Sequence, residues 1–443
     1  MSALARWFHA NGHFVAGYDR TQTELTKQLQ SEGITVQFED DEALLPKPVI
    51  EEIDKTLVVY TPAIPDSHTQ YNYIKETGYA LLKRSEVLGE ITKSNFTIAV
   101  AGTHGKTTTS SMIAHILKNS GCNCTAFVGG IMTNYNSNIL IGEDNKDNIV
   151  VVEADEFDRS FLTIHPDIAV ITSVDADHLD IYGTQKALKN TFKEFIGNIK
   201  KGGKLFIEEV TNDDLGTKAF KKHIEIQTYG LSMGAIRTAN LTVENAKMTF
   251  DYKGKGEVNA LKLPIPGLHN VENAVGAISA TYAVGCDEDQ IKNGLESYKG
   301  VKRRFEYIIN SENLVYIDDY AHHPEEISSL LDSIRLMYPK NKITVVFQPH
   351  LYSRTRDFAA EFSDSLSIAD EVLMLDIYPA REKPIDGVNA EMLLEDMDVA
   401  HKELCTKSNL IEKLKNRKLE VLLTVGAGDI DTVVKPIKEA FTN

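Results

Sequence analysis

The residues that most constrain this chain lie at positions 101–109 and read Ala-Gly-Thr-His-Gly-Lys-Thr-Thr-Thr. They follow an apolar run at 96–100, typical of a buried strand, and precede an amphipathic helical pattern that ends near Gly121. A strand, a glycine-containing loop and a helix are the setting of a phosphate-binding loop, where backbone N–H groups bind an anion. We therefore predict a nucleotide phosphate site made by Gly102, Thr103, His104, Gly105, Lys106, Thr107 and Thr108. Lys106 is expected to meet the β- and γ-phosphates, and Thr107 to put its hydroxyl on Mg²⁺.

One position departs from the usual spacing of such loops. Val100 stands where the first glycine is expected, which leaves the shortened form Gly-Thr-His-Gly-Lys-Thr. This form narrows the set of nucleotide-binding proteins to which the loop can belong.

Length and composition exclude several classes of protein. A chain of 443 residues suggests about three domains, and its net charge of −17 argues against broad binding to nucleic acid or a membrane surface. Its apolar runs are far shorter than the ~20 residues of a membrane span, and no signal-like N-terminus is visible. The cysteines lack the spacing of common zinc sites, so we predict reduced thiols in a cytosolic protein.

Apolar and polar patterns predict an α/β chain in three segments, 1–92, 93–299 and 300–443. Strands are expected at 14–18, 34–38, 57–60, 96–100, 149–152, 168–172, 314–317, 343–347, 372–375 and 421–425. Continuous β-branched runs are typical of parallel strands covered on both faces. The Gly- and Lys-rich stretch 238–263 is expected to be an antiparallel insertion, and the clearest helix of the last segment is 324–338.

Acidic residues follow two predicted strands of the second segment. Glu153, Asp155 and Glu156 come after one strand, and Asp177 and His178 come after the next. Open α/β sheets bind ligands at the carboxyl ends of their strands, and carboxylates there can hold a Mg²⁺ ion that bridges phosphate oxygens. A solvated acidic loop explains Asp155 and Glu156 equally well. On local sequence, a hydrogen-bonded histidine explains His178 better than ligation does, because Mg²⁺ prefers oxygen.

Two groups of residues carry side chains suited to a nucleotide. Asn270 and Asn273 are three apart on a predicted helix and can read an adenine edge, although Asn270 can equally cap that helix. Arg304, in the basic run 302–304, can clamp phosphates, although a solvated linker is the simpler interpretation.

Further polar residues follow predicted strands of the last segment. Asp319 can accept a hydrogen bond from a ribose hydroxyl, and His322 or His323 can orient a reacting group, although a turn with a helix cap explains them too. Arg354 is suited to clamp a carboxylate through its two-pronged guanidinium.

Taken together, these motifs resemble the Mur ligases, ATP-dependent enzymes that form amide bonds in peptidoglycan synthesis. The residues that carry the resemblance lie at 102–109, 153–156, 177–180, 266–273, 302–305, 318–324, 347–356 and 426–430. Each motif alone is weak. Their order along nearly the whole chain makes the combination specific.

The resemblance implies three domains: a Rossmann-like UDP-sugar-binding domain at 1–92, a central ATP-binding domain at 93–299, and a Rossmann-like amino-acid-binding domain at 300–443. The central domain is expected to be a P-loop ATPase-type parallel sheet with an antiparallel insertion. The implied reaction joins L-alanine to the lactyl carboxylate of UDP-N-acetylmuramate through an acyl phosphate, giving ADP and phosphate. ATP and Mg²⁺, with Mn²⁺ as an alternative, are the implied cofactors of a cytoplasmic bacterial protein that is a monomer or homodimer.

The resemblance also assigns roles to individual positions. Catalysis is assigned to Lys106, Glu153, His178 and His323, and the metal to Thr107, Glu153 and His178. The nucleotide is assigned to the loop residues 102–108 together with His269, Asn270, Asn273, Arg304 and Asp319. The substrates are assigned to Ser2, Asp19, His323, His350 and Arg354.

The chain departs from the family pattern in three places. The family has a strand and a glycine-rich loop before a Met-Ser pair that opens a helix, whereas this chain starts at that helix, so weak UDP-sugar binding is expected. Leu351 stands where an arginine is common, which leaves Arg354 or Arg356 to bind the amino-acid carboxylate. Ser173 occupies a position that is often asparagine.

Two other functions fit parts of the pattern. A murein-peptide ligase joins the same nucleotide sugar to a tripeptide and shares the phosphate loop and the adenine helix, although residues 159–162 and 177–180 favour L-alanine. A non-catalytic nucleotide-binding homologue would keep the ATP site and lack the sugar site.

Overall fold

The computed structural model describes residues 1–61, 64–143, 145, 147–175, 179–244, 247–380 and 382–442. The chain divides into two compact units. The first contains Met1–Arg237, Gly254–Gly256 and Ala274–Gly294, and the second contains Thr238–Lys253, Glu257–Asn273 and Leu295–Asn443. Three elements run from one unit into the other: β12 (Ile236–Glu244), α10 (Leu268–Ala283) and α11 (Glu288–Ser297).

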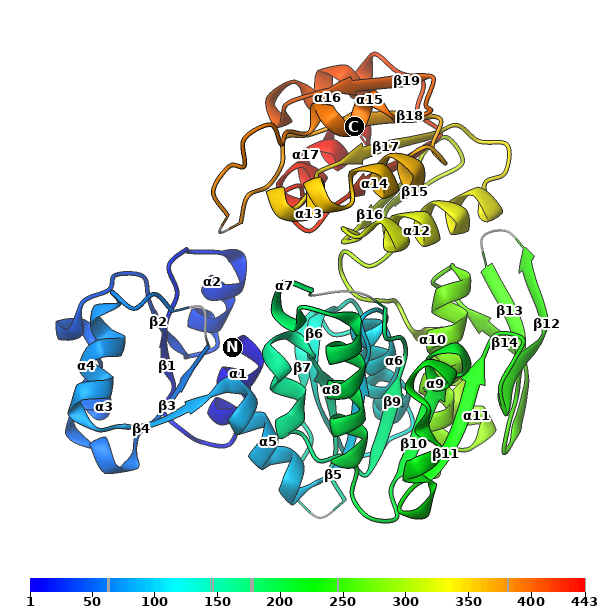
Figure 1. The fold of residues 1–443 in the computed structure, drawn as a ribbon. Helices are drawn as coiled ribbons and strands as arrows, with labels where there is room; N and C mark the ends of the chain where they lie inside the picture. Colours follow the sequence, from blue (N-terminus) through cyan, green and yellow to red (C-terminus); the bar gives the residue numbers. More distant parts are fainter. Residues whose placement is uncertain are drawn as a thin grey trace. The chain divides into compact units, whose positions relative to one another are not determined.

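The N-terminal part of the first unit holds two small parallel strand pairs, β1 with β2 and β3 with β4 (Figure 1). Its strands are β1 (Ala16–Tyr18), β2 (Thr35–Gln37), β3 (Leu57–Tyr60) and β4 (Ala80–Lys83). Its helices are α1 (Ser2–Ala10), α2 (Glu24–Ser31), η1 (Glu42–Leu44), α3 (Lys47–Glu51), η2 (Ile53–Lys55), α4 (Thr69–Thr77) and α5 (Arg84–Ser94). The helix expected at the first residues is therefore present. The strand predicted at 57–60 is confirmed with the same bounds, and those predicted at 14–18 and 34–38 are confirmed with shorter bounds.

A larger sheet forms the rest of the first unit, with its strands in the order β7-β6-β8-β5-β9-β10-β11. Only β6 and β7 are antiparallel among these strands. Their bounds are β5 (Phe96–Ala101), β6 (Cys124–Met132), β7 (Ser137–Leu140), β8 (Ile149–Ala154), β9 (Ile168–Ile171), β10 (Lys204–Glu208) and β11 (Glu225–Gly230). Because β5 lies between β8 and β9, the carboxyl ends of all three strands meet beside the phosphate loop.

Helices cover both faces of this sheet, as the β-branched strand pattern predicts. Ala99 and Ala101 of β5 share a core with α5 and with Leu188 and Phe192 of α8 (Gln185–Gly197). On the other face, α6 (Lys106–Asn119) packs against β5, β6 and β8 (Figure 1). The remaining helices of this unit are η3 (Phe157–Thr163), α7 (Leu179–Tyr182), α9 (Glu209–Leu215) and η4 (Thr217–Lys222).

The second unit is built on a six-stranded sheet with the order β15-β16-β20-β17-β18-β19, in which only β15 and β16 are antiparallel. The strands are β15 (Glu306–Asn310), β16 (Val315–Asp319), β17 (Ile343–Phe347), β18 (Glu371–Met374), β19 (His401–Leu404) and β20 (Val421–Val425). The same unit holds the antiparallel hairpin of β13 (Lys247–Lys253) and β14 (Glu257–Leu263), which lies within the insertion expected at 238–263.

Helices again cover both faces of the six-stranded sheet. One core contains residues of α12 (Pro324–Met337), α14 (Ala359–Leu366) and α15 (Glu391–Glu395). The other core contains residues of α16 (Lys407–Lys415) and α17 (Asp431–Thr442). The short helix α13 (Tyr352–Asp357) follows β17. Both units are thus layered α/β structures, which confirms the predicted fold class.

Two further observations concern the whole described chain. No helix among the described residues is long and apolar enough to cross a membrane. Cys122, Cys124, Cys286 and Cys405 are all free thiols, as predicted.

Candidate active site

The phosphate loop connects β5 to α6 and depends on two glycines. Gly102 has a φ of 141°, and a Cβ there would lie 2.1 Å from the Thr172 hydroxyl oxygen. Gly105 has a φ of 79° and caps the N-terminus of α6. Since side-chain-bearing residues rarely adopt such a backbone, both glycines are needed to turn the chain from the strand into the helix. The predicted strand, loop and helix are therefore present, with α6 beginning at Lys106.

Lys106 is held inside the loop by a buried carboxylate. Its ammonium donates to Glu156 Oε1 at 2.8 Å and to the Gly102 carbonyl at 2.6 Å. The Glu156 side chain is fully buried. Burial lowers the pKa of Lys106, but the charges of Glu156, Asp155 and Glu153 outweigh it and leave that pKa raised. Of the two interpretations of Glu156, the solvated acidic loop is wrong, because this carboxylate is the partner of the loop lysine.

Glu153 joins the loop to the neighbouring strand β6. The Thr107 hydroxyl donates to Glu153 Oε1 at 3.0 Å, and the Gly129 N–H donates to Glu153 Oε2 at 2.8 Å. A Cβ on Gly129 would lie 2.6 Å from Glu153 Oε2, so the glycine makes room for the carboxylate. A hydroxyl and a carboxylate oxygen so close together are the hard ligands that Mg²⁺ prefers. His178, the third predicted ligand, and Asp177 lie outside the described residues.

The chain after β9 closes the loop from the other side. The Ser173 hydroxyl is 2.9 Å from the Thr103 hydroxyl and accepts a hydrogen bond from the His104 N–H at 3.0 Å. Asp175 donates its N–H to the Thr103 hydroxyl at 3.0 Å. Ser173 was noted in the sequence only as a departure from a family pattern, and the structure gives it a definite role in shaping the loop.

A second cluster of predicted residues lies in the second unit, around the carboxyl end of β16. Asp319 accepts hydrogen bonds from the N–H groups of Phe305 at 2.6 Å and Ala321 at 2.7 Å. Burial raises the pKa of Asp319 to about 6, although the Arg304 charge opposes the rise. Arg304 lies over the Tyr320 ring, 5.0 Å from its centroid.

The basic run before β15 is therefore not a solvated linker. Arg303 donates to Asp318 at 3.1 Å and to the Gly426 carbonyl at 2.6 Å, which ties the run to the ends of β16 and β20. Asp318 is itself buried and accepts from the Thr424 hydroxyl at 2.6 Å. Arg303 anchors the run, and Arg304 is the more exposed of the two arginines.

The start of α10 carries the residues predicted to approach adenine. His269 Nδ1 is 3.1 Å from the Ser329 hydroxyl, and burial lowers the pKa of His269 to about 4. Asn270 and Asn273 are both buried, and the Asn270 amide donates back to the Pro266 carbonyl at 2.5 Å. Asn270 therefore lies inside the helix and does not cap it through its side chain, so the capping alternative is wrong.

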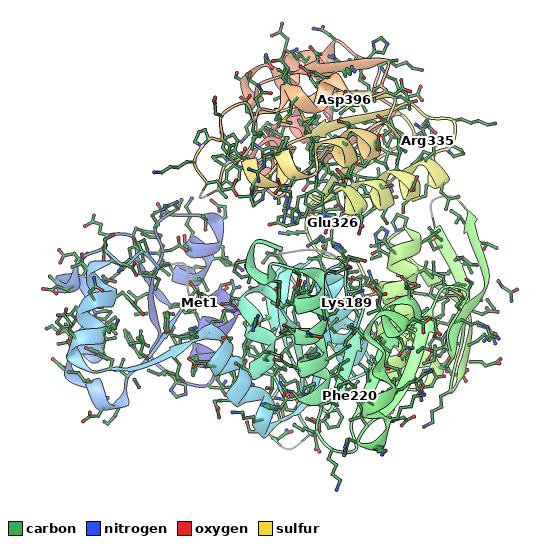
Figure 2. The ribbon with its side chains drawn as sticks, viewed as in Figure 1. Met1, Lys189, Phe220, Glu326, Arg335 and Asp396 are labelled. Carbon is green, nitrogen blue, oxygen red and sulfur yellow. The ribbon has the colours of Figure 1, made fainter. Side chains whose placement is uncertain are left out.

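The two histidines before α12 sit at a helix cap. Glu326, in the first turn of α12 (Figure 2), accepts from the His322 N–H at 2.9 Å and from the His323 N–H at 3.2 Å. Burial lowers the pKa of His322 to about 4. His323 is buried, with its ring 4.9 Å from that of Phe358. The helix cap that the sequence offered as the alternative interpretation is present, and Glu326 makes it.

His350 and Arg354 lie together after β17. The His350 ring stacks on Tyr378 at 5.8 Å, and burial followed by the Arg354 charge lowers the pKa of His350 to about 4. Arg356 is exposed and pairs with Asp357 at 2.7 Å. Leu351 has a φ of 70°, a strained backbone for a leucine, and its N–H donates to the Tyr378 carbonyl at 2.9 Å. Of the two arginines left to bind a carboxylate, Arg354 is the one beside the histidines.

The two residues near the N-terminus that were assigned to the substrates, Ser2 and Asp19, make few polar contacts with the described residues. The Ser2 hydroxyl accepts from the Asn138 amide at 3.0 Å. Asp19 is exposed and accepts from the Thr21 N–H at 3.0 Å in a turn. Nothing in these contacts distinguishes a substrate-binding role, so both assignments stay predictions.

Three family models match the chain in sequence order. They are the Mur ligase family catalytic domain at residues 1–96, the Mur ligase middle domain at 100–281, and the Mur ligase glutamate ligase domain at 303–431. The chain belongs to the Mur ligase family.

Relatives match this Mur ligase over nearly its full length. It is 48% identical to the UDP-N-acetylmuramate--L-alanine ligase of Cytophaga hutchinsonii, over 99% of this chain and 94% of that protein. It is 45% identical to the protein of the same name from Christiangramia forsetii, over 100% of this chain and 95% of that protein.

Solved structures agree with this assignment. The UDP-N-acetylmuramate-alanine ligase of Thermotoga maritima has a TM-score of 0.83 at 28% identity, covering 100% of this chain and 96% of that one. A murein peptide ligase from Psychrobacter arcticus has a TM-score of 0.69 at 23% identity, covering 100% and 96%, which shows a shared fold.

Proposed function

We propose that this Mur ligase joins L-alanine to the lactyl carboxylate of UDP-N-acetylmuramate and converts ATP to ADP and phosphate. The observation that carries the proposal is the match to relatives of that name over nearly the whole chain, at 48% identity for the Cytophaga hutchinsonii protein. The phosphate loop, with a buried Lys106 and with Glu153 on the Thr107 hydroxyl, supplies the chemistry that such a reaction needs.

In the first step, a carboxylate oxygen of the sugar attacks the γ-phosphorus of ATP. A P–O bond forms, the bond from the γ-phosphorus to the β-bridging oxygen breaks, and ADP leaves. The reaction needs close positioning and stabilisation of negative charge. We assign the phosphates to the loop N–H groups and to Lys106, whose raised pKa keeps its ammonium charged. His269, Asn270 and Asn273 are assigned to adenine, and Arg304 and Asp319 to the rest of the nucleotide.

The residues at the mouth of the loop fit a divalent cation. The Thr107 hydroxyl and the Glu153 carboxylate, 3.0 Å apart, would hold Mg²⁺, with His178 as a further proposed ligand. When bound, the ion neutralises charge on the phosphate oxygens. Replacing Glu153→Gln is expected to raise at least tenfold the Mg²⁺ concentration that gives half-maximal turnover. An unchanged Mg²⁺ requirement would remove Glu153 from the metal site.

In the second step, the amine of L-alanine attacks the carbonyl carbon of the acyl phosphate. A C–N bond forms, the C–O bond to the phosphate breaks, and the nitrogen loses a proton. We assign the alanine carboxylate to Arg354, with His350 and His323 near the amino acid and the transferring phosphoryl group. The charge of Arg354 helps to lower the pKa of His350, so the two side chains are close enough to belong to one site.

We also propose that the protein works in the bacterial cytoplasm, with functional domains at 1–92, 93–299 and 300–443. The family-model matches change from one domain to the next at 96–100 and between 281 and 303, which supports the division.

Phosphate release measured with each substrate omitted in turn tests the function. The expected result is release that needs ATP, UDP-N-acetylmuramate and L-alanine together. Release with a tripeptide in place of L-alanine would instead indicate a murein-peptide ligase. Binding of ATP without release under any of these conditions would indicate a non-catalytic homologue.

A further inference from the structure

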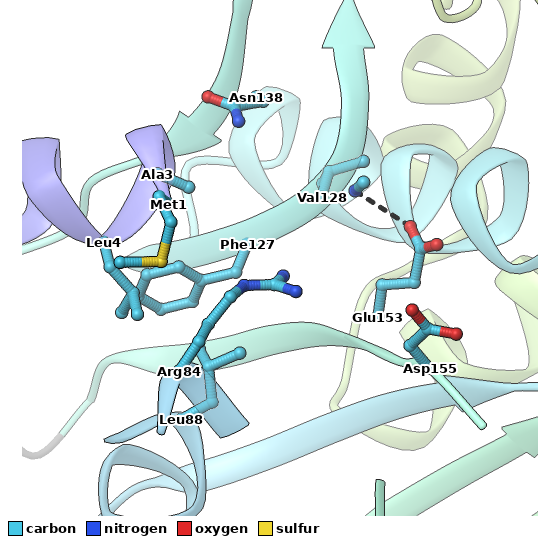
Figure 3. A pocket seen from close by; sticks show the side chains of 11 residues that line it. Met1, Ala3, Leu4, Arg84, Leu88, Phe127, Val128, Asn138, Glu153 and Asp155 are labelled. Carbon is cyan, nitrogen blue, oxygen red and sulfur yellow. Dashed lines mark hydrogen bonds between the residues drawn. The ribbon is translucent and has the colours of Figure 1, made fainter. Parts of the chain in front are cut away.

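A cavity of about 310 Å³ in the first unit extends from the start of α1 to the acidic end of β8 (Figure 3). Its lining residues on the α1 side include Met1, Ala3 and Leu4, and its far end is lined by Gly129, Glu153 and Asp155. Glu153 also contacts Thr107 of the phosphate loop. A molecule in this cavity would therefore reach the phosphate loop from the side of the N-terminal segment.

Arg84 is the one arginine or lysine among the cavity's lining residues in the described chain. Figure 3 shows its side chain reaching into the space between Phe127 and the carboxylates of Glu153 and Asp155. Those carboxylates have other partners. Glu153 accepts from Thr107 and Gly129, and Asp155 accepts from the Phe157 N–H at 3.2 Å. Within the described chain, the Arg84 guanidinium forms no hydrogen bond or ion pair.

The position of Arg84 disfavours an ordinary structural role. Arg84 is the first residue of α5, an eleven-residue helix. A positive charge in the first turn of a helix opposes the helix dipole and costs about 0.3–1 kcal/mol at a surface. The side chain is exposed and packs into no core. An unpaired cation at an unfavourable place beside a cavity is explained if the ligand of that cavity is an anion.

We propose that Arg84 binds an oxyanion of the nucleotide-sugar substrate. This rests on the proposed function, because that substrate offers two such groups, the lactyl carboxylate and the diphosphate. Guanidinium binds either group through paired N–H donors. The cavity leads from Arg84 to Glu153, where the attacking carboxylate must meet ATP, so Arg84 is a binding and positioning residue for that substrate alone.

The test compares wild-type protein with Arg84→Ala and Arg84→Lys. Steady-state phosphate release gives KM for each substrate. Arg84→Ala is expected to raise KM for UDP-N-acetylmuramate at least tenfold and to leave KM for ATP and L-alanine within twofold. Arg84→Lys keeps the charge and loses the paired donors, so an intermediate KM is expected. Lys93→Ala is the matched control, because Lys93 is an exposed cation near the other end of the same helix.

Calorimetric binding of three ligands identifies the oxyanion. UDP carries the diphosphate, UDP-N-acetylglucosamine adds a sugar without the lactyl group, and UDP-N-acetylmuramate adds the carboxylate. If Arg84 binds the carboxylate, Arg84→Ala weakens only the last ligand. If it binds the diphosphate, all three weaken together.

Thermal unfolding separates this role from a structural one. Removing a charge that opposes the helix dipole should leave the melting temperature of Arg84→Ala unchanged or slightly higher. A lower melting temperature with KM raised by the same factor for all three substrates overturns the inference. So do a KM and a binding affinity for UDP-N-acetylmuramate that are unchanged in Arg84→Ala. A wild-type chain that neither binds the three ligands nor turns over overturns the proposed function and the inference with it.

Discussion

The ammonium of Lys106 lies 2.8 Å from both carboxylate oxygens of Glu156, a side chain with no exposed surface. The two residues are 50 positions apart, one at the start of α6 and the other just after β8. Lys106 is therefore fixed in the phosphate loop before any nucleotide arrives. A phosphate that binds there gains an ammonium that is already oriented, which avoids the cost of ordering a long side chain.

Variants of the Lys106–Glu156 ion pair should affect the free energy of unfolding and the enzymatic activity differently. Lys106→Met should abolish phosphate release and lower the free energy of unfolding by about 3–5 kcal/mol, because it leaves a buried carboxylate unpaired. The double variant Lys106→Met/Glu156→Gln should recover most of that stability and stay inactive. Urea unfolding and phosphate-release assays measure the two effects. Turnover by Lys106→Met, or no recovery in the double variant, would contradict the assigned pairing.

Ser173 offers a test of loop shape that leaves the charges unchanged. Ser173→Ala removes the contacts of its hydroxyl with Thr103 and the His104 N–H. Losing these hydrogen bonds should reduce the free energy that holds the loop in its binding shape by about 1–2 kcal/mol. KM for ATP should therefore rise about 5- to 30-fold. KM for L-alanine should stay the same. Equal KM for ATP in wild type and variant would show that the loop keeps its shape without Ser173.

Arg354 and Arg356 form a matched pair on the helix α13. Arg354→Ala should raise KM for L-alanine at least tenfold, because the variant loses the arginine beside His350. Arg356→Ala should behave like wild type, since Arg356 is exposed and pairs with Asp357. Steady-state kinetics with varied L-alanine measures both. The reverse ranking of the two variants would move the carboxylate site to Arg356.

His115, on α6, should make the protein sensitive to mild acid. Burial lowers the pKa of His115 to about 4, and its Nδ1 lies 2.7 Å from the Tyr135 hydroxyl. In the unfolded chain the group titrates near its ordinary value of 6.5. A lowered histidine pKa means that unfolding takes up a proton between these values. Its stabilising contribution is therefore present above pH 6.5 and is lost as the pH falls toward 4.

His115→Phe tests this contribution. At pH 7 the variant should be less stable than wild type, because the Tyr135 hydroxyl loses its partner. Between pH 7 and pH 4.5 the difference in unfolding free energy between the two proteins should shrink by about 2 kcal/mol. Urea titrations at several pH values measure it. A difference that is constant with pH would show that His115 titrates normally in the folded protein.

Local patterns in the sequence predicted the elements that carry the site. The apolar run before Gly102 identified β5 because a strand buried on both faces needs a continuous run of apolar residues. The helical pattern after Lys106 identified α6 because its hydrogen bonds join residues four positions apart. The acidic residues after β8 were recognised because parallel strands present their carboxyl ends at one edge of a sheet. Asp319, His350 and Arg354 were found at strand ends in the second unit for the same reason.

The sequence could not predict which side chains these residues contact. Glu156 was expected to be a solvated acid as readily as a functional one, and Arg304 was chosen over Arg303 without knowledge that Arg303 bonds Asp318 and the Gly426 carbonyl. The role of Ser173 depends on Thr103, 70 positions away. Arg84 carried no motif at all.

The sequence by itself therefore determined the phosphate loop and the family, because glycine conformation, periodicity and motif order are local or additive properties of the chain. Only the tertiary structure decided which side chains meet. The strand order β8-β5-β9 places Glu153 and Glu156 on one side of the loop and Ser173 on the other. That order is fixed by pairing between distant strands and by burial of both sheet faces, which no short stretch of sequence encodes.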